Sequence, residues 1–290
     1  MIALLPAAGL GSRLFPATLN QPKEMLPVPV FSNGQIFMKP TLQIIFEQLY
    51  KLGIREFFIV IGTSKEAVIR HFTPNERYLP IAREMREEID KFYNMLRDSQ
   101  ICYLIQSHPR GFGDAVLQAR NLVKEDFLVI AGDTIITSYN PRVQEPQDPL
   151  AHFRRLLEIH NQYTSLATLS LQTVEDPRRY GVVEGEREEK EGNVIRIQSA
   201  VEKPQEPPTN LAITGLYIFK PDIFDALEEL RAPEGGELQL TDGINTLARR
   251  GVYGVLMDEN DRRYDIGSPE LYGDVFTQLY ELARRGARIV

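Results

Sequence analysis

Residues 4–13 read LLPAAGLGSR, and residues 22–27 read PKEMLP. The apolar run at residues 2–5 predicts a short buried strand, and a glycine-bearing turn follows it directly. In α/β sheets ligands bind at this kind of junction, because backbone N–H groups of the loop can point at an anion. Arg13 and Lys23 add two positive charges to the same loop, and such a pair suits a polyphosphate. The stretch therefore predicts an α/β fold with a phosphate-binding loop after its first strand.

Two common phosphate-binding motifs are absent from this loop. The dinucleotide fingerprint G-x-G-x-x-G needs a third glycine where this chain has Leu14, and the P-loop needs Gly-Lys-Ser or Gly-Lys-Thr, which occurs nowhere in the sequence. A dehydrogenase is therefore disfavoured. On the glycines alone, an ordinary turn with solvated basic side chains explains the loop equally well.

Predicted strands alternate with predicted helices along the first half of the chain, which is typical of parallel βαβ units. The second half adds further strands. We therefore expect an α/β fold with a Rossmann-like, mixed and mainly parallel central sheet flanked by helices. The predicted strands are residues 2–5, 57–61, 101–105, 127–131, 165–173, 181–183, 194–202, 211–219 and 252–257. The predicted helices are residues 41–52, 64–72, 77–96, 113–123, 150–162, 221–230, 240–250 and 268–285.

Composition bounds the class of protein. The chain has 290 residues, 43% of them apolar and 25% charged, which is average for a globular protein and argues against disorder, collagen-like repeats and coiled coils. A formal charge of −7 disfavours a dominant nucleic-acid-binding surface. No apolar run approaches the roughly 18 residues that span a bilayer, and the start of the chain lacks the positive flank of a signal peptide. The single cysteine, Cys102, excludes an intrachain disulfide, so we expect a soluble cytoplasmic protein without nucleic-acid or membrane partners.

Polar residues follow two further predicted strands. Gln106 comes directly after residues 101–105 and leads into a loop with Gly111; its amide both donates and accepts, so it can read the edge of a pyrimidine. Asp133 follows the next strand at the rim of the sheet, and Asp265 offers a second carboxylate. Two such oxygen ligands, with substrate phosphates and water, suit Mg²⁺. Two simpler explanations stay open: the amide of Gln106 only forms hydrogen bonds within its own loop, and the two aspartates only cap turns.

The loop and its continuation resemble the signature of the sugar-phosphate nucleotidylyltransferases. The resemblance rests on residues 9–13, Pro16, Thr18 and residues 22–27, where the form KEMLP is most similar to that of the bacterial UTP–glucose-1-phosphate uridylyltransferases. Further matches follow in order and extend over residues 2–266. The resemblance implies a fold of the nucleotide-diphospho-sugar transferase type. It also implies transfer of a nucleotidyl group from UTP to glucose 1-phosphate, which gives UDP-glucose and pyrophosphate.

The resemblance implies roles for the charged residues. Arg13 and Lys23 would contact the phosphates of the nucleoside triphosphate, and Lys203 the phosphate of the sugar 1-phosphate. These three are the catalytic candidates, because cations screen the repulsion between two anionic substrates. Asp133 and Asp265 would hold Mg²⁺ as the cofactor. The nucleotide-binding set implied by the resemblance is Ala8, Gly9, Gly11, Ser12, Gln106 and Gly111, with Ala8 and Gly9 near the base.

Residues of the second half would form the sugar pocket. The resemblance places Gly181 against the sugar, Glu202 on its hydroxyl groups, and Thr214 and Gly215 in the pocket wall. A carboxylate can accept from two neighbouring hydroxyls, which makes the role of Glu202 chemically sensible. Taken alone, Glu202 and Lys203 are more simply a surface ion pair of little energetic weight.

We predict one domain over residues 1–290. Residues 1–138 would form its nucleotide-binding half, residues 139–267 its sugar-phosphate-binding half, and residues 268–290 a C-terminal helix. The resemblance implies a homodimer or homotetramer. Two alternatives stay open: a glucose-1-phosphate thymidylyltransferase or another sugar-1-phosphate nucleotidylyltransferase, and a catalytically silent subunit that senses a nucleotide sugar.

Overall fold

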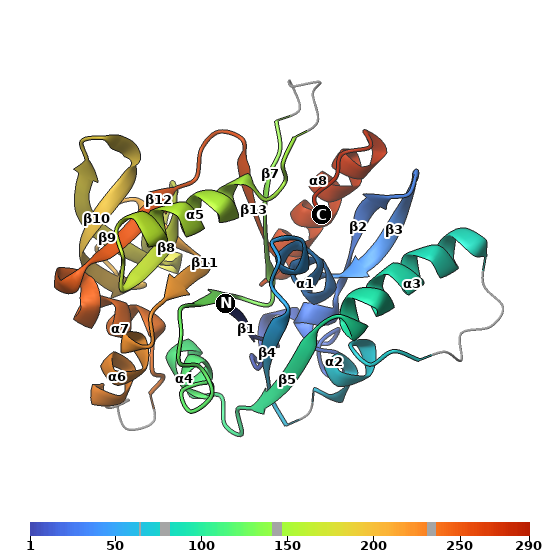
Figure 1. Ribbon diagram of the computed structural model, residues 1–290, viewed down its shortest axis with the longest axis horizontal. Helices are drawn as coiled ribbons and strands as arrows, with labels where there is room; N and C mark the ends of the chain where they lie inside the picture. The colour runs from blue at the N-terminus through green and yellow to red at the C-terminus, as the bar shows by residue number, and fades with distance from the viewer. Residues whose placement is uncertain (64, 76–81, 141–146, 231–235) are drawn as a thin grey trace.

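A nine-stranded sheet runs through the protein, with helices on both of its faces (Figure 1). The computed structural model describes residues 1–63, 65–75, 82–140, 147–230 and 236–290. The strands, in spatial order, are β5 (Gln100–Ile105), β4 (Glu56–Ile61), β1 (Ile2–Pro6), β6 (Phe127–Ile130), β11 (Leu211–Phe219), β8 (Ala167–Thr173), β12 (Val252–Leu256), β10 (Glu191–Glu202) and β9 (Gly181–Glu188). The first four are parallel, β11 runs antiparallel between β6 and β8, and β12 is parallel to β8. The prediction of a mixed sheet flanked by helices is confirmed.

The sheet is buried on both faces. Within β1, Ala3 and Leu5 belong to one buried cluster, whereas Ile2 and Leu4 belong to the other. Burial on both sides explains why β1 is an unbroken apolar run. Helices α1 (Thr41–Lys51), α2 (Glu66–His71), α3 (Arg83–Arg97), α5 (Ala151–Gln162) and α8 (Pro269–Arg284) contribute to the first cluster. Helices α4 (Phe112–Leu117), α6 (Asp222–Glu229) and α7 (Leu240–Leu247) contribute to the second.

Most predicted elements are present, but two differ in extent. The predicted helix at residues 113–123 ends at Leu117, and the chain continues through turns such as the one in which Leu122 N donates to Ala119 O (2.9 Å). The predicted strands at residues 181–183 and 194–202 are longer in the structure, where β9 ends at Glu188 and β10 begins at Glu191. The turn that joins them is correspondingly shorter than predicted. Ser64 and residues 77–81, which belong to predicted helices, lie outside the described residues.

Two antiparallel ribbons were not predicted. The first pairs β2 (Pro27–Ser32) with β3 (Gln35–Pro40), and the second pairs β7 (Thr134–Ser138) with β13 (Asp261–Asp265). Prolines in β2 and charged residues in β13 hide the apolar pattern by which strands are recognised from sequence. The second ribbon matters for the site, because each of its strands adjoins a predicted metal ligand.

The C-terminal helix α8 packs on the core. Ser268 caps its first turn by accepting a hydrogen bond from Leu271 N (3.3 Å), and Val275, Leu279 and Ala283 are buried. Val275 and Leu279 belong to the first buried cluster, so this face of the helix packs on the core. Within the described ranges, no helix has the length and apolar character needed to cross a bilayer.

Candidate active site

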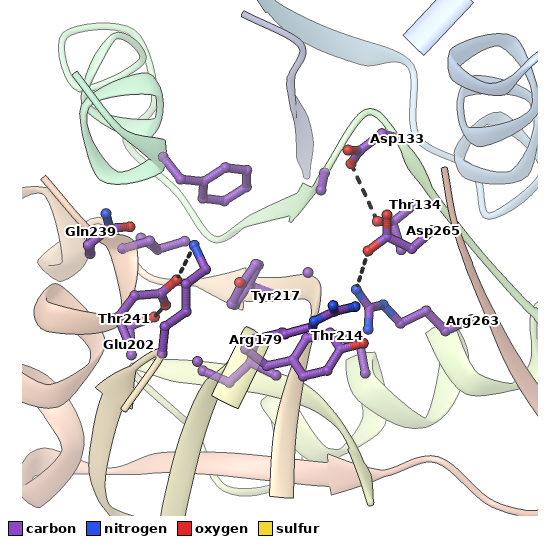
Figure 2. A pocket seen from close by; sticks show the side chains of 18 of the residues that line it. Asp133, Thr134, Arg179, Glu202, Thr214, Tyr217, Gln239, Thr241, Arg263 and Asp265 are labelled. Carbon is purple, nitrogen blue, oxygen red and sulfur yellow. Dashed lines mark hydrogen bonds and ion pairs between the residues drawn. The ribbon is translucent and has the colours of Figure 1, made fainter. Parts of the chain in front are cut away.

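Two cavities adjoin at the carboxyl ends of the parallel strands. The first cavity, of about 510 Å³, is lined by the loop after β1, Lys23 and the segment after β5. The second cavity, of about 270 Å³, is lined by residues from β9, β10, β11 and β13 (Figure 2). Asp133 and Lys203 line both cavities. A ligand in one cavity would therefore lie next to a ligand in the other.

Every residue predicted for the site lines one or both of these cavities. The first cavity contains Ala8, Gly9, Gly11, Ser12, Arg13, Lys23, Gln106, Gly111, Asp133 and Lys203. The second contains Asp133, Gly181, Glu202, Lys203, Thr214, Gly215 and Asp265. The parallel strands β1, β5 and β6 bring most of the first set together, because their carboxyl ends meet at one edge of the sheet.

The ribbon β7–β13 holds the two aspartates. Asp133 directly precedes β7, and Asp265, the last residue of β13, pairs with Thr134 at the start of β7. Ile266 N also donates to the carbonyl oxygen of Asp133 (3.2 Å). Both carboxylates consequently border the second cavity from adjacent strand ends (Figure 2).

Each aspartate is paired with a cation. Lys23 Nζ donates to Asp133 Oδ2, and Arg263 Nη2 donates to Asp265 Oδ2 (2.7 Å). Although burial opposes ionisation of Asp133, the Lys23 ammonium holds the pKa of this carboxyl below its usual value. Asp133 in turn raises the pKa of Lys23 against the effect of burial. Both groups are therefore charged at neutral pH.

Arg13 is a cation that has no partner among the described residues. It makes no hydrogen bond or ion pair with any residue that the structure describes, and it lines the first cavity. A Cβ atom added to Gly267 would lie 3.2 Å from its guanidinium, so Arg13 lies beside the segment after Asp265. An unpaired guanidinium at this place is available to an anionic ligand.

A second buried pair supports the loop from behind. Lys65 Nζ donates to Glu24 Oε2 (2.8 Å) and to the carbonyl oxygen of Ala7. Burial raises the pKa of Glu24 and lowers that of Lys65, and the pair compensates both effects in part. This contact ties the strand end at Ala7 to the motif that carries Lys23. Sequence reasoning missed Lys65, which follows β4 without any recognisable motif.

The amide of Gln106 has a fixed orientation. Its Nε2 donates to the carbonyl oxygen of Gly111 (3.1 Å) and to Asp114 Oδ2 (2.7 Å). Since both partners are acceptors, Oε1 is the end left to accept a hydrogen bond from a ligand. Gly111 has a φ of +103°, and a Cβ there would lie 2.5 Å from Leu238 O. The positive φ and the close approach of the Leu238 backbone together make glycine necessary at this position.

Glu202 and Lys203 both line the second cavity. Lys203 Nζ lies 3.1 Å from Glu202 Oε1, and Glu202 Oε2 accepts from Thr241 Oγ1 (2.7 Å) (Figure 2). A Cβ on Gly181 would lie 2.8 Å from Thr241 Oγ1 and 3.0 Å from Glu202 Oε2. A Cβ at position 181 would therefore displace one or both of these side chains. Thr214 directs its hydroxyl to the carbonyl oxygen of buried Ser170 (3.2 Å), so its contribution to the wall is mainly apolar.

Two arginines of the second cavity were not predicted from the sequence. Arg179 and Arg263 stand beside the motifs Tyr180-Gly181 and Tyr264-Asp265, and their adjacency to these motifs was the only signal. With Lys203 they give the second cavity three cations. Cationic side chains at this place can pair with a phosphate group of a ligand.

The donor set fits one hard cation. No group of three or more His, Cys, Asp and Glu side chains in the described part of the chain is arranged to hold a metal. Asp133 and Asp265 offer two carboxylates, and Mg²⁺ is commonly held by one or two carboxylates together with substrate phosphates and water. The residues present therefore fit Mg²⁺ when a phosphorylated ligand supplies the remaining oxygens.

The fold and the two adjoining cavities, each with cationic side chains in its lining, define an α/β protein suited to hold two phosphorylated ligands side by side. Residues 2–281 match the protein-family model described as nucleotidyl transferase. The chain belongs to the nucleotidyl transferase family, and the resemblance drawn from its loop is confirmed.

Similar proteins support this assignment. The UTP–glucose-1-phosphate uridylyltransferase 2 of Streptococcus pyogenes is 38% identical over 272 residues, which cover 91% of this chain and 85% of that protein. The Bacillus subtilis UTP–glucose-1-phosphate uridylyltransferase is 37% identical over 96% of this chain and 89% of its own length. A crystal structure of UDP-glucose pyrophosphorylase with UDP-glucose superposes with a TM-score of 0.82 at 29% identity, covering 97% of this chain and 98% of that one.

Proposed function

We propose that the protein transfers a uridylyl group from UTP to glucose 1-phosphate, giving UDP-glucose and pyrophosphate. The observation that carries the proposal is the sharing of Asp133 and Lys203 by the two cavities, which lets two phosphorylated substrates meet. The names of the similar proteins, at up to 38% identity, support the choice of these substrates. UTP would occupy the first cavity and glucose 1-phosphate the second.

Base selection follows from the fixed amide of Gln106. With its Nε2 engaged by Gly111 and Asp114, the free Oε1 needs a donor from the base. Uracil and thymine carry a hydrogen on N3, whereas cytosine presents an acceptor there. Gln106 therefore favours a uracil-type base over cytosine. A thymine methyl group changes the fit by only about 1–3 kcal/mol, so UTP and dTTP have to be compared directly.

The chemistry would be an in-line displacement at the α-phosphorus of UTP. The attacking oxygen belongs to the phosphate of glucose 1-phosphate and is already an anion, so no general base is needed. The barrier is the repulsion between two polyanions, and Arg13, Lys23 and Lys203 would screen it while they hold the geometry. Asp133 and Asp265 would hold Mg²⁺, which when bound neutralises part of the phosphate charge. The bond between the α-phosphorus and the bridging oxygen breaks, and pyrophosphate leaves.

A pyrophosphate-release panel tests the proposal. The four common ribonucleoside triphosphates and dTTP are crossed with several sugar 1-phosphates in the presence of Mg²⁺. We expect the highest kcat/KM for UTP with glucose 1-phosphate. Absence of release from every combination would favour a silent, ligand-sensing subunit, and preference for dTTP would favour a thymidylyltransferase.

We also propose, from the family resemblance, that the protein assembles into a homodimer or homotetramer. Light scattering after size-exclusion chromatography measures this directly. A mass near that of one 33.1 kDa chain would contradict it.

A further inference from the structure

The two candidate metal ligands are already paired with side-chain cations. Asp133 accepts from Lys23. Asp265 accepts from Arg263 Nη2 at 2.7 Å, as Figure 2 shows. The other oxygen of Asp265 accepts from Gly267 N (2.8 Å). A divalent ion that uses Asp265 must therefore take the place of the Arg263 guanidinium or share the carboxylate with it.

Arg263 is a largely buried side chain that also contacts an aromatic ring. Its guanidinium lies over the ring of Tyr180, with the central carbon 4.9 Å from the ring centroid. The side chain is only 11% exposed, and its Nε is buried without a hydrogen-bond partner in the described part of the protein. The cation–π contact with Tyr180 helps to hold the guanidinium, while Nη2 reaches Asp265 and the residue lines the second cavity.

The electrostatic field of Arg263 also reaches the other carboxylate. It is among the charges that lower the pKa of Asp133. With Lys23 and Arg263 in place, the two aspartates are neutralised, and a free divalent ion meets little net negative charge. A phosphorylated ligand changes this balance, because its oxygens offer both cations a new acceptor.

We propose that Arg263 is a positioning residue that occupies Asp265 in the ligand-free protein and yields this carboxylate to the metal when its guanidinium turns to a substrate phosphate. The proposal rests on the proposed function, since it takes Asp133 and Asp265 as the metal ligands. Arg263 thereby makes metal binding depend on substrate binding. The phosphate in question is that of the sugar 1-phosphate, because Arg263 lines the second cavity and not the first.

The test is Mn²⁺ binding to the substrate-free protein, measured from the electron paramagnetic resonance signal of the free ion. Arg263→Gln removes the competing cation, so we expect the Mn²⁺ dissociation constant to fall about fivefold. Arg263→Lys keeps the charge and is expected to stay close to wild type. The matched control is Arg179→Gln, because Arg179 lines the same cavity and makes no ion pair with any described residue. Thermal melting of each variant establishes that it is folded.

A second measurement distinguishes an exchange of Arg263 between Asp265 and the substrate phosphate from a general effect of its positive charge. In steady-state kinetics Arg263→Gln should raise the KM for glucose 1-phosphate more than the KM for UTP. An unchanged Mn²⁺ dissociation constant in Arg263→Gln, or an equal fall in Arg179→Gln, would overturn the inference while leaving the proposed function intact. If Asp133→Asn and Asp265→Asn leave Mn²⁺ binding unaltered and wild type releases no pyrophosphate, the proposed function itself fails.

Discussion

Asp265 lies directly opposite Thr134 in the antiparallel ribbon β7–β13, and Asp133 immediately precedes that threonine. Two carboxylates that are more than a hundred residues apart in sequence are thus joined through a single pair of backbone neighbours. The far end of the ribbon is fastened by Ser138, which donates to Asp261 Oδ1 (2.5 Å). The geometry of the candidate metal site is therefore set by backbone pairing rather than by mobile loops.

The aspartates should be indispensable for metal-dependent turnover. Asp133→Asn is expected to lower Mg²⁺-dependent pyrophosphate release by orders of magnitude, because a site with two protein ligands cannot spare one. Asp274→Asn, on the exposed face of α8, is the matched control and should behave as wild type. Near-wild-type rates of Asp133→Asn at low Mg²⁺ would contradict the ligand assignment.

The two lysines should fail in different ways. Lys203→Ala is expected chiefly to raise the KM for glucose 1-phosphate, because its ammonium serves the second substrate. Lys23→Ala is expected chiefly to lower kcat, because it removes charge near the reacting phosphates and leaves half-buried Asp133 without its partner. Initial rates with each substrate varied in turn separate the effects. Unchanged kinetics in both variants would exclude the charge-screening account.

Gly181 should tolerate no side chain. In Gly181→Ala the new Cβ would press on Glu202 Oε2 and Thr241 Oγ1, so the carboxylate must move away from the sugar. We expect kcat/KM for glucose 1-phosphate to fall about ten- to hundredfold, as for a misplaced binding group. Gly273→Ala is the control, since nothing lies within 4 Å of its added Cβ. Equal activity of the two variants would show that Glu202 is not a sugar ligand.

The buried pair Glu24–Lys65 should stabilise the protein as a pair. Lys65→Met leaves the buried carboxylate of Glu24 without its partner, and we expect the free energy of unfolding to fall by about 3–5 kcal/mol. The double variant Glu24→Leu, Lys65→Met should recover much of this loss. Urea unfolding of the wild type, the two single variants Glu24→Leu and Lys65→Met, and the double variant measures the coupling energy between the two residues. A double variant as unstable as the sum of the single ones would contradict a paired role.

His71 should make stability fall in mild acid. Burial lowers its pKa from 6.5 to about 4, while its Nε2 donates to Gln43 Oε1 at 2.8 Å. The unfolded chain then binds a proton at this histidine more readily than the folded protein does. The contribution of neutral His71 to the free energy of unfolding is therefore complete above pH 6.5 and is lost as the pH falls toward 4. We expect a loss of about 2 kcal/mol, given partial exposure. His71→Phe should flatten this part of the pH profile relative to wild type, whereas exposed His108→Gln should not.

The sequence predicted what depends on local pattern. The buried strand at residues 2–5, the loop with Arg13 and Lys23, and the aspartate at the end of β6 all follow from short segments. The cavities confirm that these segments meet, because parallel strands end at one edge. What each residue does there remains a prediction until it is tested by substitution.

Other features of the site depend on contacts between segments far apart in the sequence, and no local sequence pattern indicates them. The strand β13 has the sequence DRRYD, in which apolar and polar residues do not alternate. Neither this strand nor the position of Arg263 was therefore predicted. Lys65 reaches Glu24 across 41 positions of sequence, and a lone lysine carries no motif. The contact of Gly111 with the Leu238 carbonyl likewise depends on segments far apart in the sequence.

The most direct test is a crystal structure of the protein with UDP-glucose. The account predicts uracil in the first cavity with its N3 hydrogen on Gln106 Oε1, glucose in the second cavity against Glu202, and the diphosphate at the junction beside Asp133 and Lys203. Density for both the base and the sugar within a single cavity, or at a place away from Asp133, would contradict it.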